Sequence, residues 1–376
     1  MPEDLGIGES GLDWIDASGE FADIVLSTRV RLARNIQGHP FGVRARPHDR
    51  IRVNERMREL LPRVVPLRGA RILEIPEMSA RERALLLERR LASRELVGEK
   101  GNRAPAPGSA LVLAPGASVS VMLNEEDHLR LQTLFSGLRV QEAWSVLDAM
   151  DDAVGAEVPY AFHPEFGFLT SCPTNVGTGL RASVLLHLPA LVLTKEIGRV
   201  LQGISQVGLT FRGLYGEGSE VVGNFFQLSN QTTLGKSEED LVDHLDRMVR
   251  QVIQYEQKAR GVLLRDAASV TEDKIWRAYG LLRYARSLSF EEFMNLLSGV
   301  RLGVSLKLLP GLRVYSLNEL MIYTQPAHLE EAAGRELAPA ESEAHRAAYV
   351  RRVLAAEPVR TSEEGGGDSA APEPAD

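Results

Sequence analysis

The spacing of apolar residues changes along this chain of 376 residues, and that change limits the folds open to it. Residues 21–34 alternate with the period of two that a strand requires, and short β-like runs dominate residues 110–233. A helical period begins at Ser237, in the N-cap position, and we expect Gly261 to end that helix. Further helical patterns follow. We therefore expect a short N-terminal segment (1–20), a mixed region (21–260), an all-α region (261–356) and a disordered, acidic, Pro/Gly-rich tail (357–376).

Two further helical patterns precede the strand-rich stretch, over residues 51–65 and 79–96. A Ser followed three residues later by Glu is the spacing of a capping box. This spacing occurs at Ser79, Ser289 and Ser316, and it predicts a helix start at each of them.

Composition excludes several classes of protein. A net charge of −8 argues against nucleic acid or an anionic membrane as partner. The longest apolar run, residues 185–194, is far shorter than the ~20 residues of a membrane helix. A single cysteine excludes a disulfide framework, and no two histidines have metal-ligand spacing. No signal-peptide pattern opens the chain, so we expect a cytoplasmic protein that holds no metal through its own side chains.

The strand-like run IVLSTRVRLAR carries two arginines one residue apart. Alternation places Ser27, Arg29 and Arg31 on one face and Thr28 and Val30 on the other. Two guanidinium groups about 6.6 Å apart match the scale of a polyphosphate. The alternative is a solvated strand face with scattered charge.

The run SVSVMLNEEDHLRLQ reads as a strand followed by a helix that Asn124 would cap. The carboxylates of its first turn would be favoured there by the helix dipole. Glu126 is a candidate catalytic base, and the alternative is a simple i,i+4 pair between Glu126 and Arg130.

The run SCPTNVGTGLRASV holds the only cysteine, Cys172, in a glycine-punctuated turn that leads to Arg181. A thiol near several arginines is favoured as thiolate, whereas a lone cysteine is otherwise a small buried apolar residue. In FRGLYGEGSE, Arg212 ends a strand before a glycine-rich loop whose N–H groups could approach a phosphate. A plain surface hairpin is the alternative for this last run.

Together these residues fit one reaction. Five arginines (Arg29, Arg31, Arg130, Arg181 and Arg212) could neutralise a nucleoside triphosphate, with Mg²⁺ bridging the phosphates. Glu126, Glu217 and the Cys172 thiolate would form an anionic pocket that suits a cation. A guanidinium must be held by carboxylates and lose a proton before its nitrogen can attack.

The motifs STRVRLAR, NEEDHLR, CPTNVGTGLRASV and RGLYGEGSE occur in this order. They resemble the ATP:guanido phosphotransferase (phosphagen kinase) superfamily. Within it the chain is most similar to the bacterial protein-arginine kinase family, McsB, over about residues 20–356, including GNFFQLSNQTTLGKSE and NELMIYTQP. The resemblance implies an α+β fold, an antiparallel β-sheet flanked by helices as in the phosphagen-kinase catalytic domain, followed by an all-α C-terminal domain.

The resemblance also implies roles for individual residues. Glu126 and Glu217 would clamp the substrate guanidinium and assist its deprotonation, with Cys172 orienting the same group. The implied ATP-binding residues are Ser27, Thr28, Arg29, Val30, Arg31, Arg130, Arg181, Ala182, Ser183, Val184, Leu185, Arg212, Gly213, Leu214, Tyr215, Gly216 and Glu217.

Members of the family phosphorylate arginine side chains in proteins and mark them for an AAA+ protease, as part of protein quality control and the stress response. They often work with an activator protein, McsA, and tend to dimerise through the C-terminal domain. We therefore expect Mg²⁺ and ATP, protein substrates bearing arginine, an McsA-like activator, an AAA+ protease and a homodimer.

Two departures from the family pattern stand out. Arg90 occupies the position near the adenine where the family usually has histidine. In the phosphoarginine pocket, whose family motif is R-D-x-x-R-A, Ser342 and Glu343 replace Arg and Asp while Arg346 and Ala347 remain. A phosphate there would lose a bidentate partner and meet a carboxylate, so we expect weak or absent control by phosphoarginine.

Two other functions compete with a protein-arginine kinase. A small-molecule arginine kinase is disfavoured because the chain lacks the helical N-terminal domain that closes over a free amino acid. A non-catalytic adaptor for arginine-rich or phosphoarginine proteins is disfavoured because Glu126, Cys172, Glu217 and all five arginines are present.

Overall fold

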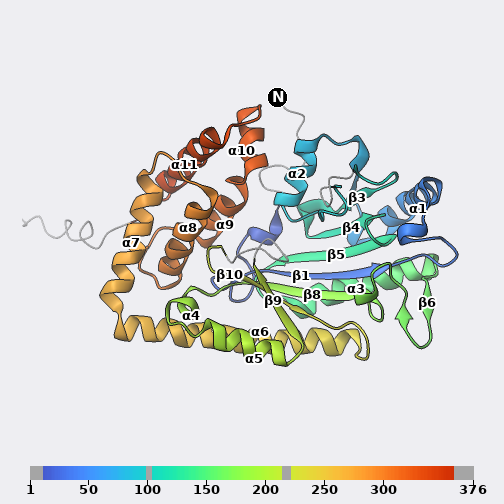
Figure 1. The fold of residues 1–376 in the computed structure, drawn as a ribbon, viewed down its shortest axis with the longest axis horizontal. Coiled ribbons are helices and arrows are strands. Elements are labelled where there is room, and N and C mark those ends of the chain that lie inside the picture. The colour runs from blue at the N-terminus through green and yellow to red at the C-terminus, as the bar shows by residue number, and fades with distance from the viewer. Residues whose placement is uncertain (1–11, 99–103, 214–221, 360–376) are drawn as a thin grey trace, which may run out of the picture.

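The computed structural model describes residues 12–98, 104–213 and 222–359. Within these residues an eight-stranded antiparallel sheet has the order β2-β3-β4-β5-β1-β8-β10-β9 (Figure 1). Its strands are β1 (Val25–Arg34), β2 (Arg71–Glu74), β3 (Ala110–Leu113), β4 (Val119–Leu123), β5 (Leu129–Ser136), β8 (Leu180–His187), β9 (Leu209–Gly213) and β10 (Phe225–Asn230). Strands β6 (Phe162–His163) and β7 (Gly167–Phe168) pair separately. The antiparallel sheet and its flanking helices confirm the α+β prediction.

Helices precede, interrupt and follow the strands. Those before the end of the sheet are α1 (Pro47–Leu60), α2 (Ala80–Glu88), α3 (Val140–Glu157), α4 (Pro189–Leu193) and α5 (Ile197–Gln206). The later ones are α6 (Glu238–Asp266), α7 (Ala268–Tyr284), α8 (Phe290–Ser305), α9 (Val314–Tyr323), α10 (Pro326–Ala333) and α11 (Pro339–Ala356). The last five gather into the predicted helical region, on the left of Figure 1. None of the helices in the described ranges is both long and apolar enough to span a bilayer.

The sheet has one apolar and one polar face because side chains alternate along β1. Val30 and Leu32 are fully buried on the apolar face. Helix α3 covers that face, since the hydroxyl of Thr133, which lies opposite Val30, donates to the carbonyl of Ala143 in α3. Helix α6 packs against β8 and β10. The helices thus leave the alternate side chains of β1 on the other face, where the candidate site lies.

Two of the three predicted Ser–x–x–Glu helix starts are confirmed. The Ser79 hydroxyl accepts from the N–H of Glu82, whose carboxylate accepts from the N–H of Ser79. Ser289 caps α8 with its hydroxyl in the same way. The third prediction is wrong, because Ser316 is buried within α9 and its hydroxyl donates to Glu357 instead.

The helix that Ser237 caps is longer than predicted. Helix α6 passes through Gly261 and ends at Asp266. A glycine inside a helix costs only about 1 kcal/mol relative to alanine. Ala259 and Leu263, two residues before and after Gly261, are buried and hold this part of the helix against the core. Packing therefore outweighs the stop signal.

Buried polar contacts join the helical region to the sheet region. The guanidinium of Arg301 in α8 donates to the carbonyl of Ala22 at 2.8 Å and to the side chain of Asn318 at 2.5 Å. Asn318 in turn donates to the carbonyl of Ile15 at 2.8 Å. Because these groups are buried, separating the two regions would expose unpaired donors and acceptors. The helical region is therefore held in a defined place beside the sheet.

Candidate active site

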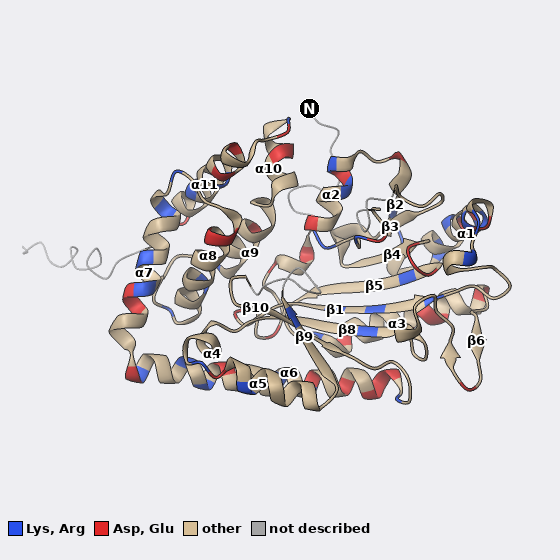
Figure 2. Cartoon of the chain, viewed as in Figure 1, with Lys and Arg blue, Asp and Glu red and all other residues tan. Residues whose placement is uncertain are grey.

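Five arginines lie on one face of the sheet. Residues directly opposite each other in an antiparallel pair share a face. Arg31 of β1 lies opposite Arg181 of β8, and Arg130 of β5 and Arg212 of β9 follow the same alternation. Figure 2 shows the basic residues as blue bands on neighbouring strands. We call this surface the arginine face, defined by Arg29, Arg31, Arg130, Arg181 and Arg212.

The other predicted nucleotide-binding residues divide between the two faces. Those whose side chains share the arginine face are Ser27, Ser183 and Leu185. Those that alternate to the opposite, buried face are Thr28, Val30, Ala182 and Val184. Gly213 ends β9. Leu214, Tyr215, Gly216 and Glu217 lie outside the described residues. A nucleotide on the arginine face could reach the buried set only through main-chain atoms.

Burial and repulsion between guanidinium groups both lower the pKa values of Arg29 and Arg31 on the arginine face. Burial lowers the pKa of Arg29 well below its ordinary value of 12.5, and the guanidinium groups of Arg31, Arg90, Arg130 and Arg181 lower it further. The pKa of Arg31 falls to about 9, through burial first and Arg130 second. Arg31 is therefore still charged at neutral pH. Packing these like charges costs free energy that a bound polyanion would recover.

Arg90 belongs to this cluster, as its predicted place near the nucleotide suggests. Its Nη2 donates to Oε1 of Gln227 at 3.3 Å, and Nη2 of Arg29 donates to the same oxygen at 3.4 Å. Gln227 was not predicted from the sequence. A glutamine among the apolar residues of the β10 run FFQLSN was the available signal.

The acidic run between β4 and β5 is a hairpin turn, and the predicted helix start at Asn124 is wrong. Asn124 has a left-handed φ of 53°, and its N–H donates to the carbonyl of His128 at 2.9 Å. The chain turns back here because Leu129 continues as a strand that pairs with β4. The turn presents adjacent carboxylates, Glu125 and Glu126, in different surroundings.

Glu125 is buried and holds Arg130, whereas Glu126 remains partly exposed. The Glu125 carboxylate accepts from Arg130 Nη1 and from the Ser93 hydroxyl. Burial alone would lower the pKa of Arg130, but Glu125 and then Glu126 outweigh it and raise that pKa. Oε2 of Glu126 stays 3.9 Å from Arg130 Nη2. The predicted Glu126–Arg130 pair therefore exists only as a loose contact, and the close partner is Glu125.

Glu126 and Cys172 are brought together by the residues beside them. The Ser171 hydroxyl donates to the carbonyl of Glu126 at 2.7 Å, and the Ser171 N–H donates to Asp127 Oδ1 at 2.6 Å. Asp127 also accepts from the side chain of Asn35 at 2.7 Å. Cys172 is only half-buried, so it is not the core residue that the alternative interpretation required. Its segment is fixed against the Glu126 turn.

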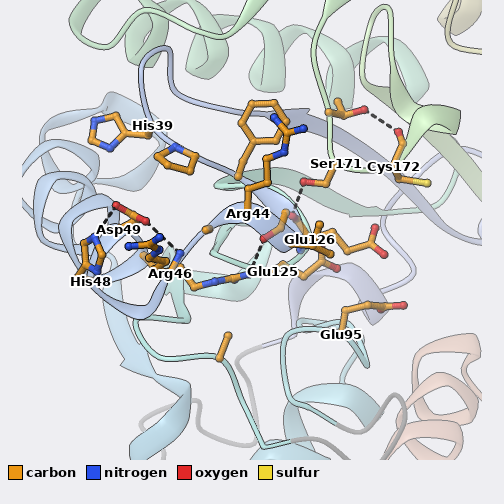
Figure 3. A pocket seen from close by; sticks show the side chains of 18 of the residues that line it. His39, Arg44, Arg46, His48, Asp49, Glu95, Glu125, Glu126, Ser171 and Cys172 are labelled. Atoms are coloured by element: carbon orange, nitrogen blue, oxygen red, sulfur yellow. Dashed lines mark hydrogen bonds and ion pairs between the residues drawn. The ribbon is translucent and has the colours of Figure 1, made fainter.

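A cavity of about 1800 Å³ opens at this junction (Figure 3). Its walls include residues 38–46 and 48–50, Glu95, Glu125, Glu126 and residues 170–173. Neither Arg29 nor Arg31 lines it, so the cavity and these two arginines are separate parts of the site. In the described parts of the chain, no three His, Cys, Asp or Glu residues cluster as a metal site.

The altered phosphoarginine motif lies on α11, in the helical region. Arg346 is buried and donates to the carbonyls of Thr324 at 3.0 Å and Leu288 at 2.8 Å. Ala347 is fully buried beside it. The Glu343 carboxylate accepts from the Ser287 hydroxyl. The residues at the positions of the family motif, the replaced Ser342 and Glu343 and the retained Arg346 and Ala347, thus make contacts within the chain.

Comparison with known proteins places this site in a class. The family model of the ATP:guanido phosphotransferase C-terminal catalytic domain matches residues 52–259. The duplicated taurocyamine kinase from Schistosoma mansoni with bound transition state analog components superposes with a TM-score of 0.57 and 25% identity. That superposition covers 68% of this chain and 37% of that longer one. The catalytic domain is therefore that of an ATP:guanido phosphotransferase.

Further matches narrow the class. The family model of the protein-arginine kinase McsB C-terminal domain matches residues 268–365. The protein-arginine kinase of Moorella thermoacetica is 46% identical over 350 residues, which are 92% of this chain and 98% of that one. The protein-arginine kinase of Pelotomaculum thermopropionicum is 44% identical over 92% of this chain and 96% of its own length. The chain belongs to the protein-arginine kinase family.

The repulsion on the arginine face predicts an unusual effect of removing one charge. Because the fold lowers the pKa of Arg29, its charged form at neutral pH is less favourable folded than unfolded. Arg29→Gln should raise the thermal midpoint of the free protein by roughly 1–2 °C if about 1 kcal/mol of repulsion is relieved in a chain of 376 residues. It should also reduce the further rise that tripolyphosphate produces in the wild type.

Differential scanning fluorimetry with and without tripolyphosphate measures both effects. Arg277→Gln, which removes an exposed arginine of α7, is the matched control and should change neither. A lower midpoint for Arg29→Gln with undiminished stabilisation by the anion would contradict the assignment.

The altered motif on α11 predicts little response to phosphoarginine. Calorimetric titration of free phosphoarginine into the protein should show no binding at micromolar concentrations, because Glu343 adds negative charge and Arg346 already serves main-chain carbonyls. Micromolar affinity that is lost on Arg346→Ala would show that the pocket still functions.

Proposed function

We propose that this chain transfers the γ-phosphate of Mg·ATP to the guanidinium groups of arginine side chains in proteins. The observation that carries the proposal is the contact between Arg130 of the arginine face and Glu126, which lines a cavity of about 1800 Å³ together with Cys172. Pockets for small ligands usually occupy about 300–1000 Å³. The larger cavity favours an arginine presented on a polypeptide over free arginine.

The arginine face would bind the triphosphate and meet the charge that develops during transfer. Phosphoryl transfer depends mainly on positioning and electrostatic stabilisation. Mg²⁺, when bound with the nucleotide, would neutralise part of the phosphate charge. Glu125 keeps Arg130 in place, so this guanidinium is positioned before the nucleotide arrives. Because Arg130 is already oriented in the folded protein, no further free energy is needed to orient it when the transition state forms.

The acidic side of the site would hold and activate the acceptor. Glu126 would pair with the substrate guanidinium, and Cys172 would orient it from the neighbouring segment. A proton passes from the attacking nitrogen to a carboxylate as the P–N bond forms and the bond from γ-phosphorus to the ADP oxygen breaks. We assign this base role to Glu126 together with Glu217, which lies outside the described residues.

Four further features of the protein's biology belong to the same proposal. The phosphorylated proteins would be degraded by an AAA+ protease, an McsA-like activator would assist, and the protein would act in the cytoplasm as a homodimer. Exposed apolar side chains on the end of α6 and on α7 support a dimer through the helical region. These are Leu264, Val270, Leu281 and Tyr284, with exposed fractions of 42%, 59%, 51% and 71%.

One assay separates the proposed activity from its alternatives. Purified protein is given ATP labelled on the γ-phosphate with Mg²⁺, and either casein or free arginine. We expect label on casein alone, lost in acid and retained in base as a P–N bond requires. Label on free arginine would indicate a small-molecule kinase. No transfer to either acceptor, with or without an added activator, would favour a binding adaptor.

Substitutions in the acidic pocket should separate transfer from nucleotide binding. Glu126→Gln and Glu217→Gln should each lower turnover on the order of 10²- to 10³-fold, since each removes a charge that holds and deprotonates the acceptor. Cys172→Ala should lower the rate without abolishing it if the sulfur only orients the acceptor. Affinity for Mg·ATP, measured by calorimetry, should change little in all three. Full activity of Glu126→Gln would remove it from the mechanism.

A further inference from the structure

A compact set of contacts joins α2 to α10, where the sheet region meets the helical region (Figure 1). The carboxylate of Glu88, the last residue of α2, accepts from the N–H groups of Ala327 at 2.8 Å and His328 at 3.1 Å. It therefore caps the start of α10 from the other region. The same carboxylate lies 2.7 Å from His328 Nδ1. Arg89 Nε donates to His328 Nε2 at 3.1 Å.

Both ring nitrogens of His328 have hydrogen-bond partners, an acceptor at Nδ1 and a donor at Nε2. A neutral imidazole with its proton on Nδ1 donates to Glu88 and accepts from Arg89, which is the assignment that satisfies both contacts. The ring is 6% exposed, and Tyr323 packs edge-on at 5.3 Å between ring centroids. Burial lowers the pKa of His328 despite the nearby Glu88 carboxylate, consistent with this neutral form.

The backbone of Arg90, at the end of α2, has a left-handed conformation. Helix α2 ends with hydrogen bonds from Leu91 N–H to Leu86 O at 3.0 Å and from Arg90 N–H to Leu87 O at 2.9 Å. Arg90 has a φ of 61°, in the left-handed position that glycine usually fills at a helix end. A side chain there is strained because its Cβ lies too close to the following carbonyl oxygen, so neighbouring contacts must hold the turn in place.

Three consecutive residues therefore connect the two regions with the nucleotide side of the site. Glu88 and Arg89 are fixed by α10, and Arg90 reaches Gln227, whose Oε1 it shares with Arg29. We propose that His328 is a positioning residue for the nucleotide site. By holding Glu88 and Arg89 it fixes the turn that presents Arg90 to the arginine face, and the helical region thereby contributes to nucleotide affinity. This inference rests on the proposed binding of ATP to that face.

The test measures Mg·ATP binding directly, by calorimetry on the full chain. His328→Leu should weaken binding about five- to tenfold. His328→Asn, which keeps an N–H donor at the Nδ1 position, should retain most of the affinity. Arg90→Gly should weaken binding to a similar degree as His328→Leu, while glycine relieves the strain at the left-handed turn. If His328 acts through Arg90, the double variant should bind no more weakly than Arg90→Gly alone.

Steady-state kinetics and a neighbouring substitution separate positioning from general loss of stability. His328→Leu should raise the KM for ATP while kcat at saturating ATP stays within about twofold. Leu329→Ala alters the next buried residue of α10, and it should lower the thermal midpoint without changing ATP affinity. An unchanged affinity in His328→Leu would overturn the inference, as would a full additional loss when it is combined with Arg90→Gly. Absence of Mg·ATP binding by the wild type would overturn the proposed function as well.

Discussion

Repulsion among guanidinium groups on one face of a central strand is the constraint on which the site depends. Arg29 and Arg31 alternate with buried apolar residues along β1, so the strand cannot turn its cations away without exposing its core side. The register with β8 then adds Arg181 to the same face. The fold thus stores an unfavourable arrangement of charge, of the kind found at functional sites, where stability is exchanged for affinity.

The turn between β4 and β5 places its two carboxylates, Glu125 and Glu126, in different surroundings. Glu125 is buried and holds Arg130, whereas the more exposed Glu126 makes only a loose contact with that arginine. Both carboxylates line the cavity. Ser171 fixes the Cys172 segment to the same turn through two hydrogen bonds. Because Glu125 already holds Arg130, the proposed cation pocket and the proposed anion site could lie side by side without neutralising each other.

Local patterns predicted the parts of the site that depend on local structure. Alternation alone placed Arg29 and Arg31 on one face, since a strand admits one arrangement of that pattern. Local patterns also led to the wrong prediction of a helix start at Asn124, because an Asn followed by acidic residues is typical of an N-cap. The pairing of Leu123 with Leu129 distinguishes the hairpin from a helix start, and this pairing is not visible in a local pattern. Gln227 and His328 were missed because their partners lie more than a hundred residues away in the chain.

The two departures from the family pattern lie near the two ends of one series of contacts. Arg346 on α11 donates to the carbonyl of Thr324, and the next residue, Gln325, donates its side-chain amide to the carbonyl of Glu88 at 3.3 Å. Glu88 is two residues from Arg90. Arg90 at the end of α2 and the altered motif on α11 are therefore joined through packed, hydrogen-bonded groups. Both departures thus lie close to the same α2–α10 contact, and this shared position is the reason to consider them together.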